Sequence, residues 1–351
     1  MDDALILPKQ LPSPTHQVIV VLEAVHLPIT DIDTTPQTHE LISYHKVHLL
    51  DEIRDRIQCA SIVVTAQALI TAESLGDAPY LKYIVTPTAG LNHVDLEECR
   101  RRGIKVSKCP GSTSLAVPEH ALSLYFAARR KTIILHSEIR STDTNGANSW
   151  KREHSIAYKM QTANGQPPLS LEQEVAGIIG YGHIGKRLKT LCEALGMKVI
   201  IINRKNNTTQ TETDVVPRVP FEQGIKSVSV LFICSVFNAS TLNMIDTAEL
   251  ALMRRDAIIV NVSRAGVMCT EAVIRALREN RISGAAMDVF DNEPASNERD
   301  SAFLAEDTRD LNLTFSPHVG YFSTKTVTTM KAMVKDNIKK YIAGEWDDFV
   351  V

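Results

Sequence analysis

Short apolar runs rich in valine and isoleucine alternate along the chain with stretches in which apolar residues recur every three or four positions. In the first third the runs are QVIVVLEA from Gln17, SIVVTAQ from Ser61, LKYIVTPT from Leu81 and IKVSKC from Ile104. A short continuous apolar run is typical of a strand buried on both faces, whereas the longer spacing is typical of an amphipathic helix. The alternation predicts a parallel sheet built from β/α units.

A second series of the same kind follows a long helical segment that begins near Pro118, a residue tolerated in the first turn of a helix. Its runs are VAGIIG, MKVIIIN, SVLFICS, AIIVNVS, GAAMDV and NLTFS. Between the two series, STDTNGANSW and TANGQPPLS have the composition of surface loops, so the stretch from Trp150 to Leu171 is predicted to be an excursion from the fold. A final helical pattern, from about Ser323 to Ile342, has no strand after it.

Residues 175 to 204 predict a strand, a glycine-rich turn and a helix that together hold a dinucleotide. Gly180, Gly182 and Gly185 have the spacing Gly-x-Gly-x-x-Gly directly after the strand, and an amphipathic helix and a second strand follow. These glycines serve a tight turn, the close approach of the backbone to a pyrophosphate and close packing of helix on strand. The start of the helix offers free N–H groups and a positive dipole end to phosphate.

The second strand of this unit ends in Asn203, Arg204 and Lys205, where an acidic residue normally binds the ribose 2′-hydroxyl. Arginine pairs with a 2′-phosphate, which an acidic residue would repel. The residues therefore favour NADP as the cofactor, and the alternative is a solvated basic loop that accepts NAD.

Composition and charge exclude several classes of protein. The chain has 351 residues, 44% of them hydrophobic and 23% charged, and a formal charge of -3. A balanced charge with few aromatic residues argues against nucleic-acid binding. The six cysteines form no CxxC pair and no histidine lies at ligand spacing, so no metal site is expected. The start MDDALILPKQ does not resemble a signal peptide and no apolar run reaches the roughly 18 residues of a membrane span, so we expect a cytoplasmic protein.

Three later segments place polar residues at the ends of apolar strands, where open α/β sheets bind ligands. They are NVSRAG with Arg264, MDVFDNEP with Asp288 and Glu293, and FSPHVGY with His318. Taken one at a time, such residues are ordinary surface or structural side chains. Taken together and in this order, with TAGLNHVDLEECRRRGIKV, CPGSTSLAVPEHALSL and the glycine turn, they make the chain resemble the D-isomer-specific 2-hydroxyacid dehydrogenase family over nearly its whole length.

By this resemblance, Arg264 binds the carboxylate and carbonyl of a 2-oxo acid, His318 protonates the carbonyl oxygen as hydride arrives, and Glu293 orients His318. The residue types suit these roles, because arginine presents a fixed fork to a carboxylate and histidine exchanges protons near neutral pH. The resemblance also implies further contacts: Asp288 at the nicotinamide carboxamide, His183 and Ile184 along the pyrophosphate, Cys234, Val262 and Ser263 along the cofactor, and backbone N–H groups of Thr88, Ala89, Gly90 and Leu91 at the substrate carboxylate.

The expected fold is α/β, with two doubly wound parallel-sheet domains. A Rossmann cofactor domain of residues 118–318 is inserted in a flavodoxin-like substrate domain of residues 1–117 and 319–351, with a cleft between the two. A chain of this length exceeds the usual size of a single core. We expect the cleft to close about a hinge near residues 117–140 and 319–342. The family resemblance implies a homodimer.

Two features depart from the family pattern or leave a choice open. Cys234 and Val236 replace the usual histidine and proline of the HxPxT segment, so packing along the cofactor is expected to differ. Tyr321 and Phe322, just after His318, either shape the pocket for the acid's side chain or pack the last helix.

The predicted activity is hydride transfer between NADP, with NAD also accepted, and a small 2-oxo acid such as glyoxylate, hydroxypyruvate or a larger analogue. A formate dehydrogenase is disfavoured because no glutamine precedes the histidine in FSPHVGY. The alternative is a dinucleotide-sensing regulatory protein without significant turnover, similar to the C-terminal-binding-protein corepressors, because a fold does not settle function.

Overall fold

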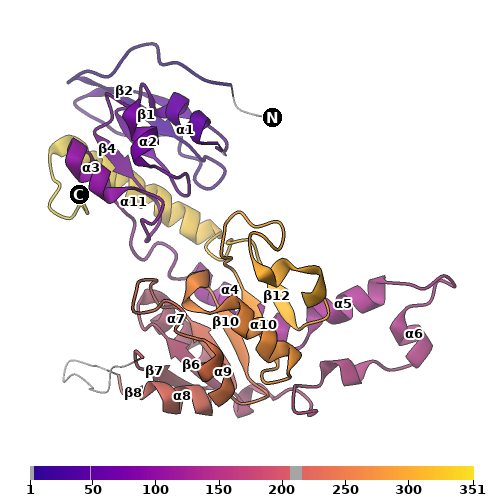
Figure 1. The fold of residues 1–351 in the computed structure, drawn as a ribbon. Helices are drawn as coiled ribbons and strands as arrows, with labels where there is room; N and C mark the ends of the chain where they lie inside the picture. The colour runs from indigo at the N-terminus through magenta and orange to yellow at the C-terminus, as the bar shows by residue number, and fades with distance from the viewer. Residues whose placement is uncertain (1–3, 48, 206–215) are drawn as a thin grey trace. The chain divides into compact units, whose positions relative to one another are not determined.

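A computed structural model of the chain describes residues 4–47, 49–205 and 216–351 (Figure 1). It divides into two compact units, Met1–Thr113 with Phe322–Val351 and Ser114–Tyr321. The boundaries expected from the sequence, after residues 117 and 318, lie a few residues from these limits. The functions assigned to the two domains stay predictions.

The first unit holds a five-stranded parallel sheet in the order β2-β1-β3-β4-β5, which is the flavodoxin-like order. Its strands are β1 (His16–Val21), β2 (Thr38–Ser43), β3 (Ile62–Val64), β4 (Tyr83–Val85) and β5 (Lys105–Ser107), and its helices are α1 (Leu50–Ile57), α2 (Ala72–Gly76), α3 (Leu96–Arg102) and α11 (Thr324–Ala343).

Both faces of this sheet are buried, as the unbroken apolar runs predict. Val18, Val20 and Ile84 belong to the core cluster shared with α1 and α3. The last helix, α11, packs on β4, and the ring of Tyr341 near its end stacks on that of Tyr83, with centroids 4.4 Å apart. The helical pattern after Ser323 thus completes the first unit.

The second unit holds a seven-stranded parallel sheet in the order β12-β11-β10-β9-β6-β7-β8. Read from β8, this is the 3-2-1-4-5-6 order of dinucleotide-binding sheets with one further strand. The strands are β6 (Val175–Ile179), β7 (Lys198–Ile202), β8 (Arg218–Val219), β9 (Val230–Ile233), β10 (Ile258–Asn261), β11 (Gly284–Met287) and β12 (Leu313–Phe315). The helices are α4 (Ala116–Arg129), α5 (Thr132–Arg140), α6 (Ser149–Glu153), α7 (His183–Ala194), α8 (Phe221–Ser227), α9 (Thr247–Leu252) and α10 (Thr270–Arg278).

Alternate residues of these strands enter different cores. Ile178 and Phe232 face a cluster that includes residues of α4 and α7, whereas Ile179 and Leu231 face one that includes residues of α8, α9 and α10. The sheet is therefore covered on both sides, which explains why its strands read as continuous apolar runs rather than alternating ones. The expected fold class of two doubly wound parallel α/β domains is confirmed.

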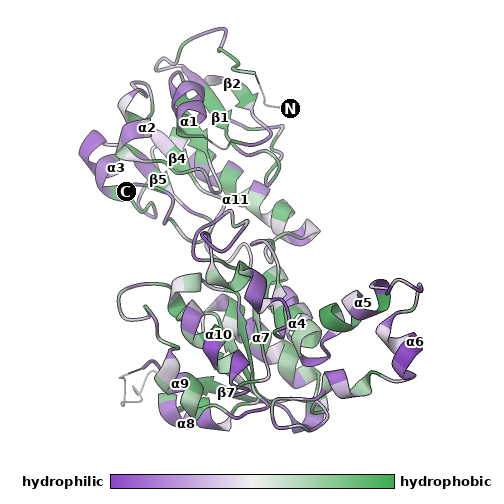
Figure 2. Cartoon of the chain, turned by 45° about the vertical axis from the view of Figure 1, so that its right-hand side comes forward, coloured by the Kyte–Doolittle hydropathy of each residue, from purple (hydrophilic) through white to green (hydrophobic). Residues whose placement is uncertain are grey.

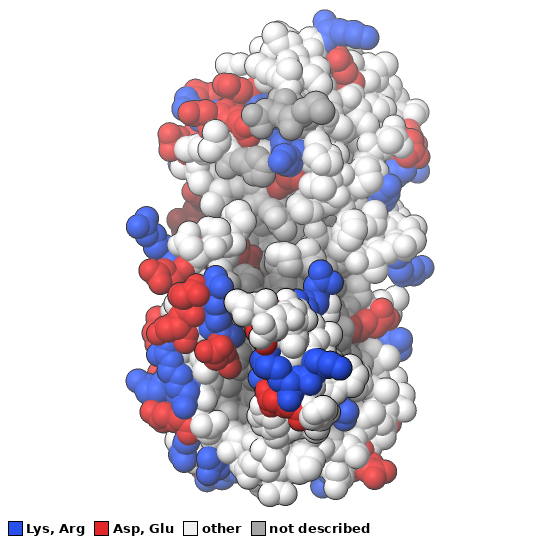
Figure 3. Space-filling view, turned by 90° about the vertical axis from the view of Figure 1, so that its right-hand side faces the viewer, with Lys and Arg blue, Asp and Glu red and all other residues white. Residues whose placement is uncertain are grey.

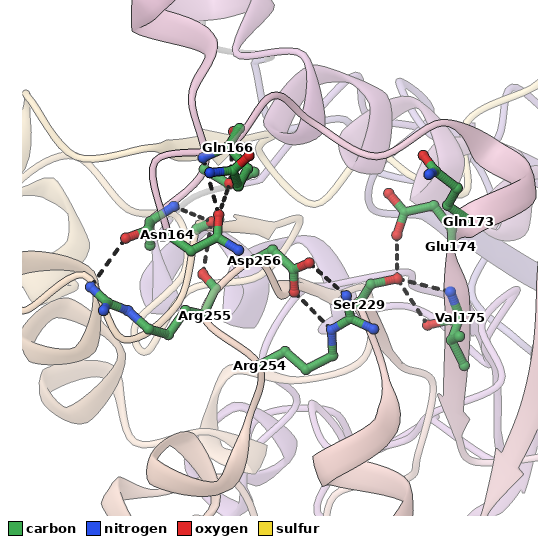
Figure 4. Close-up of polar contacts among 12 residues, drawn as sticks. Asn164, Gln166, Gln173, Glu174, Val175, Ser229, Arg254, Arg255 and Asp256 are labelled. Carbon is green, nitrogen blue, oxygen red and sulfur yellow. Dashed lines mark hydrogen bonds and ion pairs between the residues drawn. The ribbon is translucent and has the colours of Figure 1, made fainter.

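A buried polar network joins the amino ends of β6 and β9 to α4. The guanidinium of Arg129 contacts the carboxylate of Glu174 at 2.6 Å, and both side chains are almost wholly buried. Glu174 also accepts a hydrogen bond from Tyr125. The Ser229 hydroxyl lies between Glu174 and the Val175 amide (Figure 4). The network satisfies buried polar groups at the edge of the sheet opposite to the glycine turn.

The segment from α5 to the 3₁₀ turn Ala157–Met160 projects from the body of the second unit (Figure 1). Hydrophobic residues lie along α5 (Figure 2). Trp150 and Tyr158 on this segment have exposed fractions of 57% and 53%. This arm overlaps the predicted excursion of residues 150–171 but begins earlier, at Thr132, and it carries exposed apolar side chains. The chain returns to the sheet where the Ala163 amide donates to Ser283.

Figure 3 draws one face of the molecule, coloured by charge. On the face drawn in Figure 3, lysine and arginine side chains are interspersed with aspartate and glutamate. Among the helices within the described ranges, none is long and apolar enough to cross a membrane. Over those same residues, no group of three histidine, cysteine or acidic side chains is arranged to hold a metal ion.

Two strands were not predicted, β2 and β8, and each lies at the edge of its sheet. Strand β2 has the sequence THELIS, with one buried residue, and β8 has only two residues. An edge strand has one exposed side, so it does not need the apolar run that identifies a central strand.

Candidate active site

The predicted cofactor and catalytic residues of the second unit lie along one edge of its sheet. The strands are parallel, so the segments that follow them all emerge at the same, carboxyl-terminal edge. In sheet order, His318 follows β12, Asp288 follows β11, Arg264 comes after β10, Gly180 follows β6 and Asn203 follows β7. Strands lie about 4.8 Å apart, so β12 and β6 are roughly 19 Å apart at this edge.

The glycine turn has the geometry expected of a pyrophosphate site. Gly180 has a φ of +94°, and a side chain there would meet the backbone of Cys234 and Ser235 after β9. A Cβ on Gly185 would lie 2.1 Å from the carbonyl oxygen of Gly180, so α7 packs directly on the turn. A Cβ on Gly182 would meet nothing within 4 Å. Two of the glycines therefore serve packing, and the third leaves open space in front of the helix.

Gly182 is the N-cap of α7, so the first amide groups of a helix of 12 residues point into this open space. The side chain of His183 is exposed and Ile184 is partly buried against the core. The turn lies between β6 and β9, where the strand order of the sheet reverses. This is the place where open α/β sheets bind dinucleotides, and the residues present fit a pyrophosphate.

The residues after β7 separate into one buried and one exposed side chain. Asn203 is 6% exposed, and its side-chain oxygen accepts the Arg204 amide at 2.9 Å. Arg204 is exposed, whereas Lys205 forms an ion pair of 2.8 Å with Glu249. Of the two cations, Arg204 is thus the one whose side chain faces solvent.

A short polar turn carries Arg264. The Asn261 side chain accepts the Ser263 amide at 3.0 Å and hydroxyl at 2.8 Å, and it donates to the Arg264 carbonyl. The Arg264 guanidinium donates to the Ser263 carbonyl at 2.8 Å. Val262 and Ser263 are buried, so the backbone that carries Arg264 is held firmly while part of its guanidinium stays available to a ligand.

His318 and Glu293 form a hydrogen-bonded pair. Nδ1 of His318 lies 2.5 Å from a carboxylate oxygen of Glu293, whose other oxygen accepts the Phe290 amide at 2.9 Å. About a third of each side chain is exposed, 32% for His318 and 30% for Glu293. With Nδ1–H donating to the carboxylate, Nε2 is the ring nitrogen left to exchange a proton with a ligand. The structure thus brings together two of the three residues predicted to catalyse the reaction.

Asp288 is 3% exposed, and its carboxylate accepts hydrogen bonds from residues on both sides of His318 in the sequence. One of its oxygens accepts the Ser316 hydroxyl at 2.6 Å and the Val319 amide at 3.0 Å, and the other accepts the Gly320 amide at 2.9 Å. Burial by itself raises the pKa of Asp288, but hydrogen bonds from His120, Ser316 and Gly320 outweigh burial and lower this pKa below its usual value. The predicted contact with a nicotinamide carboxamide stays a prediction.

The segment after β9 carries apolar side chains at this edge. Val236 is 74% exposed, and the Phe237 ring lies over Gly266, whose Cβ would be 2.7 Å from it. Cys234 is half-buried, and burial raises the pKa of its thiol to about 12, so it is an unreactive packing residue.

The predicted substrate loop belongs to the first unit, where it follows β4. The Thr88 hydroxyl donates to the Gly90 carbonyl at 2.7 Å, and the Thr88 carbonyl accepts the Cys109 amide. Ala89 is exposed, and Gly90 and Leu91 are half-buried. Their proposed contact with a substrate carboxylate is untested.

Tyr321 ends the second unit and packs against its core cluster, while Phe322 begins the first unit with 59% of its surface exposed.

The sequence analysis did not predict two polar residues that lie beside Asp288. Nε2 of His120 on α4 lies 2.7 Å from the Ser316 hydroxyl and 3.4 Å from Asp288. Ser316 was recognisable by its place before His318, but nothing in the sequence connects His120 with a residue 196 positions away.

Comparison with known proteins identifies the second unit. The NAD-binding domain of D-isomer specific 2-hydroxyacid dehydrogenases matches residues 124–320 of the chain. The chain belongs to the D-isomer-specific 2-hydroxyacid dehydrogenase family. Glycerate dehydrogenase of Methylorubrum extorquens is 30% identical over 311 residues, which cover 88% of this chain and 90% of that protein.

Other members of this dehydrogenase family agree in sequence and fold. Glyoxylate reductase of Thermococcus litoralis is 30% identical over 297 residues, 85% of this chain and 84% of that one. The structure of D-lactate dehydrogenase from Aquifex aeolicus, complexed with NAD and lactic acid, has a TM-score of 0.69 at 20% identity and covers 95% of this chain and 99% of that one. The protein is a D-2-hydroxyacid dehydrogenase with a Rossmann domain for a nicotinamide dinucleotide, and the corepressor-like alternative is not favoured.

Proposed function

We propose that this dehydrogenase is an NADP-preferring reductase of a small 2-oxo acid, with His318, Glu293 and Arg264 as its catalytic residues. The observation that carries the proposal is the His318–Glu293 pair on the loops after β12 and β11, at the same sheet edge as the glycine turn after β6. A proton exchanger and a dinucleotide site on one edge are what reduction of a carbonyl requires.

The cofactor would be held by the turn of Gly180, Gly182 and Gly185 and by the first amides of α7, with Arg204 at the adenosine ribose. A bound reduced nicotinamide supplies the hydride that reduces C2 of the acid. The chain supplies orientation and a positive helix terminus, which stabilises the phosphates. Val262, Ser263 and Cys234 would line the cofactor along the middle of the edge.

The protein's own side chains supply the proton for the reaction and bind the carboxylate of the substrate. As hydride reaches C2, Nε2 of His318 gives its proton to the carbonyl oxygen, which becomes the hydroxyl of the product. Glu293 keeps the ring oriented through Nδ1 and stabilises the charged imidazolium before the transfer. Arg264 binds the substrate carboxylate with its guanidinium, and the backbone amides of Ala89, Gly90 and Leu91 would complete that site.

The experiment that tests the activity is reductase turnover, followed by the absorbance of reduced nicotinamide, with a panel of glyoxylate, hydroxypyruvate, pyruvate and phenylpyruvate. We expect turnover with at least one acid. Tight NADPH binding with no turnover on any acid would contradict the proposal and favour the dinucleotide-sensing alternative.

Substitutions assign the roles. His318→Gln should lower kcat about 10²- to 10⁴-fold, the usual contribution of a general acid, while the NADPH dissociation constant changes little. His45→Gln is the matched control, because His45 is exposed in the first unit and belongs to none of the proposed sites. Arg264→Lys should lower kcat/KM about 10- to 100-fold, because lysine cannot form a bidentate pair with a carboxylate. Retained activity in either active-site variant would refute the assigned role.

The cofactor preference rests on Arg204. An exposed arginine beside buried Asn203 fits a 2′-phosphate, and no acidic side chain stands at either position to take a ribose hydroxyl. Arg204→Asp should shift the ratio of kcat/KM for NADPH over NADH by about tenfold or more toward NADH, since it replaces an attractive with a repulsive charge. Arg100→Asp, on α3 of the first unit, is the matched control, and an equal effect in both variants would contradict the assignment.

We also propose a cleft between the two units that closes on the ligands about residues 117–140 and 319–342. Small-angle scattering with and without NADPH plus oxalate tests this closure, and an unchanged scattering profile would count against it.

A cytoplasmic location stays a prediction, which cell fractionation tests.

A homodimer is proposed from the family resemblance and from the projecting arm, with the exposed apolar side chains of Ile133, Ile139, Trp150 and Tyr158. Light scattering should give a dimer mass for the wild type and a smaller mass for Trp150→Asp. A monomeric wild type at assay concentration would contradict it.

A further inference from the structure

The loop that carries His318 has an unfavourable backbone conformation. His318 has a φ of +52°, in the left-handed region that residues with a Cβ seldom adopt. Its amide donates to the carbonyl of Ser316 at 3.1 Å, so the chain turns tightly at the histidine. Such a conformation persists only where the surroundings determine it. The residues that hold this loop therefore decide where the imidazole points.

Asp288 fixes the backbone on the carboxyl side of His318 and the side chain before it. It accepts the amides of Val319 and Gly320 and the hydroxyl of Ser316, at 3.0, 2.9 and 2.6 Å. A Cβ on Gly320 would lie 2.7 Å from the Asp288 carboxylate, so loop and carboxylate are in direct contact. These three donors surround His318 in the chain and leave it little freedom.

His120 supports this arrangement from another element, helix α4. The Ser316 hydroxyl gives its proton to Asp288, so it accepts a hydrogen bond from Nε2–H of His120 at 2.7 Å. The same nitrogen is 3.4 Å from the nearer Asp288 oxygen, and the His120 ring would lie 3.0 Å from a Cβ on Gly320. His120 thus touches the loop, its serine and its carboxylate anchor at once.

We propose that His120 and Ser316 are positioning residues that hold the loop of residues 316–320, and hence His318, in its reactive orientation through Asp288. Neither residue needs to touch substrate or cofactor. The kinetic consequence rests on the proposed function of His318, whereas the anchoring of the loop does not depend on it.

Hydrogen exchange of the peptide spanning residues 315–322 tests the anchoring. Phenylalanine keeps the size of the His120 ring but has no donor, and glutamine places an N–H donor near the position of Nε2. We expect His120→Phe and Ser316→Ala to speed exchange of the Val319 and Gly320 amides about tenfold, the effect of losing one hydrogen bond. His120→Gln should recover most of the protection. Ser123→Ala is the matched control, since this exposed serine lies on α4 and bonds only the His120 carbonyl among its described contacts.

Kinetics test the positioning. His120→Phe and Ser316→Ala should lower kcat about tenfold while KM and the NADPH dissociation constant stay within about twofold, because each removes one support of the proton donor and no ligand contact. In the double variant the decrease in log kcat should be smaller than the sum of the decreases in the two single variants, because both substitutions remove the same hydrogen bond between His120 and Ser316.

The outcomes separate the two proposals. Unchanged exchange in His120→Phe overturns the anchoring, whatever the turnover. Faster exchange with an unchanged kcat overturns the positioning of His318. A wild type that reduces no 2-oxo acid refutes the proposed function, while the exchange result still decides whether His120 holds the loop.

Discussion

Alanine at the second and third glycines of the turn separates cofactor binding from folding. A Cβ on Gly182 meets nothing within 4 Å, and the residue has a φ of -83°, which alanine adopts freely. A Cβ on Gly185 lies 2.1 Å from a backbone oxygen, which cannot rotate away. Gly182→Ala therefore places a methyl group in the space proposed for the pyrophosphate, whereas Gly185→Ala forces α7 away from β6.

The magnitudes follow from these contacts. For Gly185→Ala the methyl group meets a backbone oxygen at 2.1 Å, so overpacking should cost about 3 kcal/mol, of which at most about 1 kcal/mol returns as helix propensity. The free energy of unfolding should therefore fall by about 2–3 kcal/mol. For Gly182→Ala, a poorer N-cap costs less than about 1 kcal/mol. NADPH affinity of Gly182→Ala should fall about 10- to 100-fold, the value of one charge-assisted hydrogen bond to phosphate.

Urea unfolding measures the first quantity and a fluorescence titration with NADPH the second. Gly76→Ala is the matched control, because its Cβ also meets nothing within 4 Å and it lies in the first unit. Gly182→Ala with wild-type NADPH affinity, or Gly185→Ala with wild-type stability, would refute the reasoning from the turn.

Three further predictions concern the buried polar groups. Glu174→Gln leaves the buried Arg129 cation without its counter-ion, so the free energy of unfolding in urea should fall by about 3–5 kcal/mol. The control is Glu193→Gln, which removes an exposed ion pair with Lys189 and should lower the free energy of unfolding by less than about 1 kcal/mol. The pKa of Asp288 is lower in the folded protein than in the unfolded chain, so the stability that its carboxylate contributes is present above the usual aspartate pKa and is lost as the pH falls through the lowered pKa. Hydrogen exchange at residues 316–320, corrected for the intrinsic pH dependence of exchange, should therefore stay constant from neutral pH to about 4 and rise below it. A rise at about pH 6 would contradict this expectation. Burial raises the pKa of the Cys99 thiol to about 11 and that of Cys109, Cys192 and Cys234 to about 12, and it also raises the pKa of Cys269. Iodoacetamide at pH 8, followed by mass spectrometry, should therefore label Cys59 first, and fast labelling of any of these five thiols would contradict their packing.

Local pattern was sufficient for the fold class and for the expectation that the site residues of the second unit follow the carboxyl ends of its strands. The apolar runs identified the central strands because those strands are buried on both faces, and parallel strands bring their carboxyl ends to one edge. Gly180, Gly182 and Gly185 were readable because their spacing serves the turn itself. Arg264, Glu293 and His318 followed from their places after predicted strands and from the family resemblance.

The edge strands β2 and β8, the pairing of Arg129 with Glu174 and the support of His318 by His120 appeared only in the tertiary structure. Each depends on which elements become neighbours, and sheet order and helix packing decide that over long separations in the chain. The left-handed backbone of His318 is of the same kind, since no local pattern in the sequence predicts it and the hydrogen bonds from Val319 and Gly320 to Asp288 hold it. Sequence alone therefore determined which groups reach the edge of the sheet, and the packed structure decided which of them hold one another in place.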